Sequence, residues 1–179
     1  MILGITGTNG AGKGTVVNFL VHHKKFNHFS VRNFLIEEIK RQGLPVDRPH
    51  MREVGNEMRK AHGPGYIAER LMEQALEETG NSVIESIRSV GEAEFLKSKG
   101  ALLWGVDADR KTRYERVLLR QSETDQVSFE QFCIYEDREM VSTQPYDMNV
   151  FAVMKMADHI FLNNGTVEEL FLQVEKVLV

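Results

Sequence analysis

Several features that mark other classes of protein are scarce in this sequence of 179 residues. Its one cysteine, Cys133, has no partner within the chain, which excludes an internal disulfide and favours a reducing compartment. No apolar run approaches the roughly 18 residues that cross a bilayer. The N-terminus lacks a charged leader followed by an apolar segment and a cleavage site. We therefore expect a cytoplasmic protein with no membrane segment.

The chain also lacks an excess of positive charge. Its net charge of −4 argues against a dedicated nucleic-acid-binding protein, because phosphate contacts usually require a basic excess. Internal repeats, low-complexity tracts and linkers are absent as well. With 42% hydrophobic residues the chain can bury one sizeable core, which predicts a single domain. Any anionic ligand must therefore meet a local cluster of cations.

A glycine-rich loop is the most informative stretch that is present. Directly after the apolar run at residues 2–5 comes Gly7-Thr8-Asn9-Gly10-Ala11-Gly12-Lys13-Gly14-Thr15, which has the P-loop spacing of Gly, four residues, Gly, Lys. The loop amides, the lysine and the start of the following helix suit phosphate, so Asn9 to Thr15 are the expected ATP-binding residues. Gly14 stands where Ser or Thr normally follows the lysine, and the hydroxyl comes one residue later. A glycine-rich turn that binds nothing is the alternative.

The rest of the chain alternates between strand and helix patterns. Strands are expected near residues 26–30, 82–88, 101–106 and 159–162, with amphipathic helices between them. Such alternation is typical of a parallel sheet covered by helices on both faces. Prolines and glycines interrupt residues 44–64, which predicts a small, mobile helical insertion. Capping boxes at Ser89, Ser128 and Thr166 mark three helix starts.

Arginines without local acidic partners are candidate anion-binding residues. Arg32 and Arg59 have no acidic residue at helical spacing. Glu85 and Arg88 follow a buried strand, and ligands of open parallel sheets lie beyond the carboxyl ends of the strands. These two residues are therefore expected beside the P-loop, although a simple ion pair between them is the alternative. The histidines at 22, 23 and 28 are interpreted as solvated surface residues.

Residues 109–121 form a second informative stretch. Arg113, Arg116 and Arg120 lie three and four residues apart on a predicted helix, where like charges repel. Asp109 offers Arg113 a local partner, whereas an incoming polyphosphate would relieve the repulsion at the other two arginines. Arg138 also lacks acidic residues at helical spacing, and the polar residues 122–126 suit the tip of a short lid.

In this order the motifs resemble adenylate kinase and other nucleoside monophosphate kinases, in particular the archaeal-type adenylate-kinase-like and dephospho-CoA-kinase-like P-loop proteins. The resemblance rests on Gly-Lys-Gly-Thr in the loop, the basic insertion, Arg116 and Arg120 before a short lid, and the turn Asn163-Asn164-Gly165. Residues 85–89, Glu-Ser-Ile-Arg-Ser, are similar to the Asp-Gly-x-Arg-Ser of that group. Glutamate and serine here replace its aspartate and glycine.

The resemblance implies a three-layer α/β P-loop NTPase fold with a five-stranded parallel sheet, an acceptor-binding insertion at about 31–65 and a lid at about 121–128. It implies ATP and Mg²⁺ as cofactors, with Thr15 and Glu85 at the metal. The implied catalytic residues are Lys13, Arg88, Arg116, Arg120 and Arg138. The acceptor site would contain Ser30, Arg32, Arg59, Glu85 and Arg88, and Asn163 and Asn164 would lie near the donor adenine.

Three functions agree with these features. The first is Mg-dependent transfer of the ATP γ-phosphoryl group to a small phosphorylated acceptor, most simply a nucleoside or deoxynucleoside monophosphate. The second is a kinase of an acceptor hydroxyl, such as a dephospho-CoA kinase or nucleoside kinase, with Glu85 as the base. The third is an ATP-binding regulatory module with little or no turnover. ATP and a small acceptor are the expected partners, and the chain is expected to be a monomer or a homodimer.

Overall fold

Five short strands form one parallel sheet in the computed structural model, which describes residues 1–120 and 127–178. The strands are β1 (Ile2–Gly7), β2 (Asn27–Ser30), β3 (Ser82–Ile87), β4 (Leu102–Asp107) and β5 (His159–Leu162). Their order across the sheet is β2-β3-β1-β4-β5, and every neighbouring pair is parallel. The strand that precedes the glycine-rich loop therefore lies at the centre of the sheet. This confirms the expected three-layer α/β P-loop NTPase fold.

The helices begin and end close to the predicted positions. They are α1 (Lys13–Lys24), α2 (Val31–Arg41), α3 (Arg48–His62), α4 (Tyr66–Glu77), α5 (Val90–Ser98), α6 (Arg110–Leu119), α7 (Phe129–Met140), α8 (Val150–Lys155) and α9 (Val167–Val177). Reciprocal capping boxes are present at Ser89 and Thr166, and the Ser128 side chain accepts a hydrogen bond from the Gln131 amide. In the described part of the chain, no helix combines the length and hydrophobicity needed to cross a membrane.

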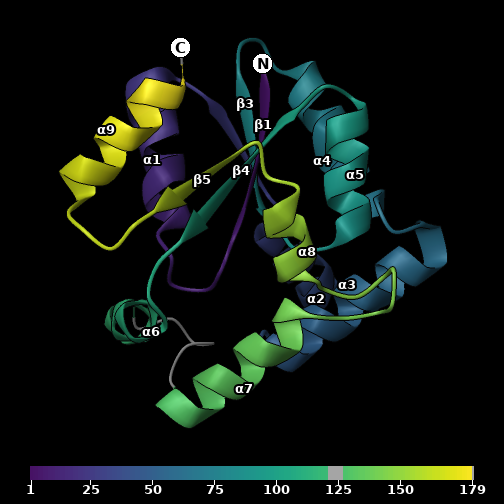
Figure 1. Ribbon diagram of the computed structural model, residues 1–179. Coiled ribbons are helices and arrows are strands. Elements are labelled where there is room, and N and C mark those ends of the chain that lie inside the picture. Colours follow the sequence, from purple (N-terminus) through teal and green to yellow (C-terminus); the bar gives the residue numbers. More distant parts are fainter. Residues whose placement is uncertain (121–126, 179) are drawn as a thin grey trace.

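The helices cover both faces of the sheet, and each face has its own core. Helices α1 and α9 lie on one face, whereas α4, α5 and α8 lie on the other (Figure 1). There are two cores because successive side chains of a strand point to opposite faces of the sheet. In β1, Leu3 and Ile5 point to the same face and are fully buried against α1 and α9. The helices α2, α3 and α7 gather beyond the carboxyl ends of the strands, at the end opposite the two termini (Figure 1).

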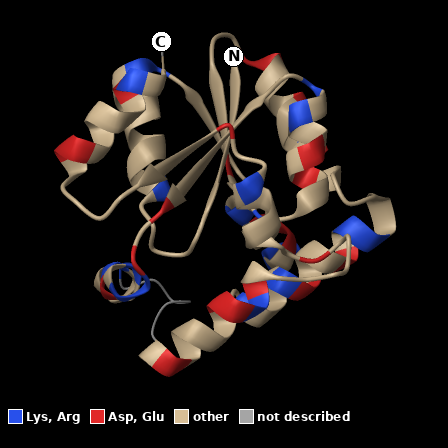
Figure 2. Ribbon diagram, viewed as in Figure 1, with Lys and Arg blue, Asp and Glu red and all other residues tan. Residues whose placement is uncertain are grey.

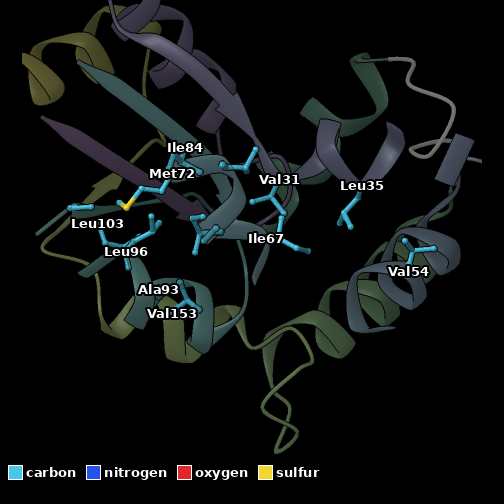
Figure 3. Packing of buried hydrophobic residues seen from close by; sticks show 14 of the residues in the cluster. Val31, Leu35, Val54, Ile67, Met72, Ile84, Ala93, Leu96, Leu103 and Val153 are labelled. Atoms are coloured by element: carbon cyan, nitrogen blue, oxygen red, sulfur yellow. The ribbon is translucent and has the colours of Figure 1, made fainter. Parts of the chain in front are cut away.

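One core extends from the sheet into the segment that the sequence predicts as an insertion. Figure 3 shows Ile84 and Leu103 of the sheet in one cluster with Leu35 of α2 and Val54 of α3. Val54 is 1% exposed, so the outer helix contributes a fully buried side chain to this core. The insertion is therefore held on the main body by apolar contacts as well as by the chain connections.

The proline and glycine residues of the insertion bound one long helix instead of interrupting several short ones. Asp47 caps α3 by accepting a hydrogen bond from the His50 amide, and Pro49 occupies the first turn, where a missing N–H has no cost. Gly63, with a φ of 110°, ends the helix after 15 residues. Residues that look like breaks in the sequence are thus the helix boundaries.

Candidate functional site

The glycine-rich loop connects β1 to α1, and three of its glycines are required by close approach. A Cβ at Gly7, where φ is 141°, would lie 2.1 Å from the Val106 carbonyl oxygen. Gly10 has a φ of 79°, and a Cβ there would lie 2.3 Å from the Arg113 carbonyl oxygen. At Gly12, where φ is 104°, a Cβ would lie 2.2 Å from Nδ2 of Asn163. Gly14 differs, because a Cβ built there has no heavy atom of the protein within 4 Å. The protein's own packing therefore gives no reason for glycine at position 14.

Asn9 is the polar side chain of the loop that is incompletely satisfied. Only 8% of the residue is exposed, and its Oδ1 accepts a hydrogen bond of 3.0 Å from Nη2 of Arg120. Its Nδ2 is buried and has no hydrogen-bond partner. A buried N–H without an acceptor is costly, so this donor fits an anion bound at the loop.

Lys13 folds back on the loop. Its Nζ donates hydrogen bonds to the carbonyl oxygens of Gly7 at 2.9 Å and Thr8 at 2.7 Å. Burial, and after it the nearby guanidinium of Arg88, lower the pKa of Lys13 from 10.5 to about 7, although the charge of Glu85 opposes the change. The ammonium group is thus held where added negative charge would favour its protonated form.

Asn163, just after the edge strand β5, is hydrogen-bonded to the glycine-rich loop. It follows β5, is buried, and donates from Nδ2 to the Ala11 carbonyl oxygen at 2.8 Å. The backbone carbonyl oxygen of Asn163 accepts a hydrogen bond of 2.9 Å from Nη1 of Arg116. Asn164 is exposed, and its Oδ1 accepts from the Asp109 amide at 2.8 Å. In this structure the asparagine turn therefore supports the shape of the phosphate-binding loop.

A cavity of about 790 Å³ lies against the loop. The predicted site residues that line it are Asn9, Gly10, Gly12, Lys13, Gly14, Thr15, Arg32, Arg59, Glu85, Arg88, Arg116 and Arg120. Residues that line it without having been predicted include Asn18, Arg48, Met51, Ser86, Glu139 and Met148. The cavity therefore joins the loop to the end of β3 and to the insertion.

The remaining predicted site residues lie outside the cavity lining. Ala11 is fully buried in the loop, and Ser30 donates a hydrogen bond of 3.0 Å to Oε1 of Glu85. Arg138 is exposed on α7 and does not line the cavity. The predicted lid at 121–128 falls mainly on residues 121–126, which lie outside the described residues.

Glu85 is the carboxylate at the end of β3, next to the loop. Its Oε1 lies 3.3 Å from Nε2 of His28 as well as accepting from Ser30. Burial raises the pKa of Glu85, but the hydrogen bonds from His28 and Ser30 and the charge of Lys13 outweigh it, so the pKa lies below its ordinary value. His28 is exposed, as expected of a surface histidine, but the pairing of β2 with β3 also places it beside this carboxylate, which the sequence did not predict.

Backbone strain follows Glu85 directly. Ser86 has a φ of 68°, in the left-handed region that residues with a Cβ rarely adopt. The pairing between β1 and β3 shifts register at this point, between Ile5 and Thr6. Ser86 is 8% exposed and lines the cavity. The resembling group has glycine here, and the chain keeps the glycine-like conformation although it carries serine.

Two arginines have partners that helical spacing did not reveal. Arg59 is 3% exposed and donates from Nε and Nη2 to Oε1 of Glu92 at 2.9 and 2.8 Å. It lines the cavity, and its acidic partner is a distant residue, since none lies at helical spacing. Arg113 is also buried, and its partner is Glu136 of α7, not Asp109. Both partners come from elements distant in sequence, 33 and 23 residues away.

Arg88 is paired as well, but not with Glu85. Its guanidinium forms an ion pair with Glu139 of α7, which also pairs with Arg48 at 3.1 Å. Figure 2 shows residues of both signs along α3 and α7, where these helices lie beside the carboxyl end of the sheet. Arg32, by contrast, is exposed and makes no ion pair with the residues the structure describes.

The oxygen atoms near the loop fit a magnesium ion bound together with phosphates. Thr15 and Glu85 both line the cavity, and Mg²⁺ prefers one or two protein oxygens completed by phosphate and water. Across residues 1–120 and 127–178, no group of three or more histidine, cysteine or acidic residues forms a separate metal site. The donors suit a metal that arrives with the nucleotide more than a resident one.

The fold and the loop define a protein of the P-loop NTPase class, and comparisons with known proteins agree. A solved structure of protein TT1252 from Thermus thermophilus matches 99% of this chain and 96% of its own, with a TM-score of 0.64 and 20% identity. A shikimate kinase from Bacteroides thetaiotaomicron covers 99% and 98%, with a TM-score of 0.61 and 14% identity. At these identities the likeness shows the fold alone.

The family is shown by sequence. The chain belongs to the family whose model is described as an AAA domain, which matches residues 6–132. It is also similar to a UPF0200 protein from Methanococcus vannielii, with 29% identity over 166 residues that cover 90% of this chain and 86% of the relative. The loop and the cavity around it fall largely within the matched range.

Proposed function

We propose that the protein transfers the γ-phosphoryl group of ATP to a small phosphorylated acceptor, most simply a nucleoside or deoxynucleoside monophosphate, in a Mg-dependent reaction. The observation that carries the proposal is the single cavity that joins the P-loop to the arginines of the insertion and of β3. A P-loop alone would bind a nucleotide. Arginines on the far side of the same cavity could bind a second anion, the acceptor phosphate.

In this proposal the chain positions the reactants and neutralises their charge. Lys13 and the loop amides bind the β- and γ-phosphates, and Arg116 and Arg120 bind the donor from α6. Magnesium, when bound through Thr15 and Glu85, would supply charge compensation between the phosphates. Arg138 has no assigned role because it is exposed away from the cavity.

Arg32 and Arg88 face the acceptor from the insertion and from β3, and Ser30 acts by holding Glu85. We further propose that residues 31–65 form the acceptor-binding part of one domain and that residues 121–128 form its lid. An acceptor phosphate is already ionised and requires no base. The lowered pKa of Glu85 agrees with this, because a carboxylate that is held ionised is a weak base but a good ligand.

A kinase of an acceptor hydroxyl is the second candidate. Solved structures with this fold include proteins named shikimate kinase, and Glu85 lines the cavity where it could accept a hydroxyl proton. Glu85→Gln distinguishes the two functions. Loss of several orders of magnitude in kcat with intact ATP binding favours the hydroxyl acceptor, whereas a smaller loss that added Mg²⁺ partly reverses favours the phosphate acceptor.

A coupled assay for ADP production tests the proposal directly. Nucleoside and deoxynucleoside monophosphates are supplied one at a time with Mg-ATP, alongside shikimate and dephospho-CoA. We expect one monophosphate to raise turnover far above the ATP-only rate. Lys13→Met should reduce this turnover about 100-fold or more, whereas Lys40→Met, at the exposed end of α2, should not.

Arg32 provides a test of the acceptor side. Arg32→Ala should raise KM for the acceptor while leaving KM for ATP unchanged, and Arg41→Ala, at the other end of α2, should change neither. ATP consumption that is independent of every acceptor would refute the kinase proposal. Tight ATP binding without any turnover would instead support a regulatory module.

A further inference from the structure

Glu139 brings a negative charge into the cationic part of the cavity. It lies near the end of α7, and its carboxylate spans two arginines from separate elements. Oε1 is 3.1 Å from Nη1 of Arg48, the first residue of α3, and Oε2 accepts from Nη1 of Arg88, just after β3. The three side chains are 14%, 16% and 22% exposed in the same order. One carboxylate oxygen thus serves each guanidinium.

This arrangement has the geometry of ligand recognition. Guanidinium groups bind planar or tetrahedral acids through paired N–H donors, and phosphate and carboxylate are the usual partners. Among the residues that the structure describes, the other carboxylate on the cavity wall is Glu85, which is already held by His28 and Ser30. The pairs of Glu139 also connect α7 to α3 and to the end of β3, but α7 does not depend on them alone.

Helix α7 has a separate and better-buried attachment one turn earlier. Glu136 is 4% exposed and pairs with the buried Arg113 of α6, whose Nη1 also donates to the Asn9 carbonyl oxygen at 3.2 Å. Glu139 can therefore leave its two arginines by a change of side-chain rotamer while α7 stays attached beside the P-loop.

We propose that the Glu139 carboxylate occupies, in the free protein, the place of an acidic group of the acceptor. Arg48 and Arg88 together bind that group once Glu139 turns away. Arg48 is thereby an acceptor-binding residue, and Glu139 selects against acceptors that lack an acid to take its place. This inference rests on the proposed function in one respect, namely that the cavity receives an acceptor beside the bound nucleotide.

The consequence for binding follows from competition. An incoming anion must displace a carboxylate that is tethered to the protein and therefore always present. Replacing Glu139 by glutamine keeps the size of the side chain but removes the charge that opposes the ligand. The affinity of the two arginines for a free acid should then increase.

The test titrates inorganic phosphate, and in a second arm acetate, into the protein saturated with ADP, followed by calorimetry. We expect Glu139→Gln to bind at least one of these probes about tenfold more tightly than the unaltered protein. Asp137→Asn is the matched control, because it removes the same charge from the same helix. The native Asp137 pairs with the exposed Arg110 and does not line the cavity. It should bind the probes with unchanged affinity.

Variants at Arg48 distinguish competition between Glu139 and the ligand from a purely structural role of Glu139. Adding Arg48→Ala to Glu139→Gln should abolish the gain, and Arg48→Lys should keep part of it; thermal unfolding confirms that each variant is folded. A gain with phosphate alone, or with acetate alone, assigns the acidic group of the acceptor. No gain with either probe, or a gain that survives Arg48→Ala, overturns the inference.

The ADP titration that precedes the test keeps the two proposals separable. Failure to bind ADP refutes the proposed function. In that case the same titrations are made without ADP, and the comparison of Glu139→Gln with and without Arg48→Ala still decides this inference, because it requires only the two arginines and a free acid.

Discussion

The pKa of Lys13 leads to a prediction about protons. Burial and Arg88 lower this pKa from 10.5 to about 7, so at pH 8.5 only about 3% of the free protein carries the proton on Lys13. A bound diphosphate stabilises the charged form and raises the pKa. Binding of ADP at pH 8.5 should therefore take up close to one proton.

Because ADP binding takes up a proton, the affinity for ADP depends on pH. Because the complex holds a proton that the free protein lacks, affinity for ADP should fall as pH rises above about 7, by up to about tenfold per pH unit. Below pH 6 both states are protonated at Lys13, so the uptake at this residue should disappear.

Calorimetry measures the uptake directly. ADP is titrated at pH 8.5 in three buffers of different ionisation enthalpy, and the slope of the observed enthalpy gives the number of protons. Lys13→Arg is the control, since a guanidinium stays charged throughout this range and should bind ADP without uptake. An observed enthalpy that does not vary between buffers for the unaltered protein would refute the reasoning.

Three further predictions concern stability. Gly14→Ala should raise Tm by about 1–4 °C, because the added Cβ meets no protein atom. The same Cβ should weaken ADP binding if phosphate approaches there. Gly12→Ala, at a φ of 104°, should lower Tm. Ser86→Gly should raise the free energy of unfolding in urea by about 0.5–1 kcal/mol by relieving the positive φ, and an unchanged midpoint would contradict the strain. Glu92→Ala should lower that free energy by about 3–5 kcal/mol, because it leaves the buried guanidinium of Arg59 unpaired. A loss below 1 kcal/mol would show that water reaches the pair.

Local patterns explain why most of the fold could be predicted. Most strands contain a short apolar run, although β2 has only one apolar residue. Helix starts are marked by caps whose residues lie within four positions of one another, as at Ser89 and Thr166. The P-loop is equally local, because its strand, glycines and lysine are contiguous in the sequence. The parallel sheet follows from the alternation of these elements.

Charge partners across the fold could not be predicted in this way. Glu92 was expected to cap α5, and it does, but the same carboxylate neutralises Arg59 from another helix. Arg48 and Glu139 are 91 residues apart, and no periodicity connects them. An arginine without a neighbour at helical spacing is therefore weak evidence for a ligand, because a tertiary contact can supply the acid.

The order of the strands also determines when this site can form during synthesis. Ile2 of β1 pairs with Ser82 of β3, and β2 pairs only with β3. At 5–20 residues per second, a ribosome needs roughly 4–16 s to make the intervening chain. Throughout that interval the first strand is finished but has no partner in the sheet, so the emerging chain carries the P-loop sequence without its fold.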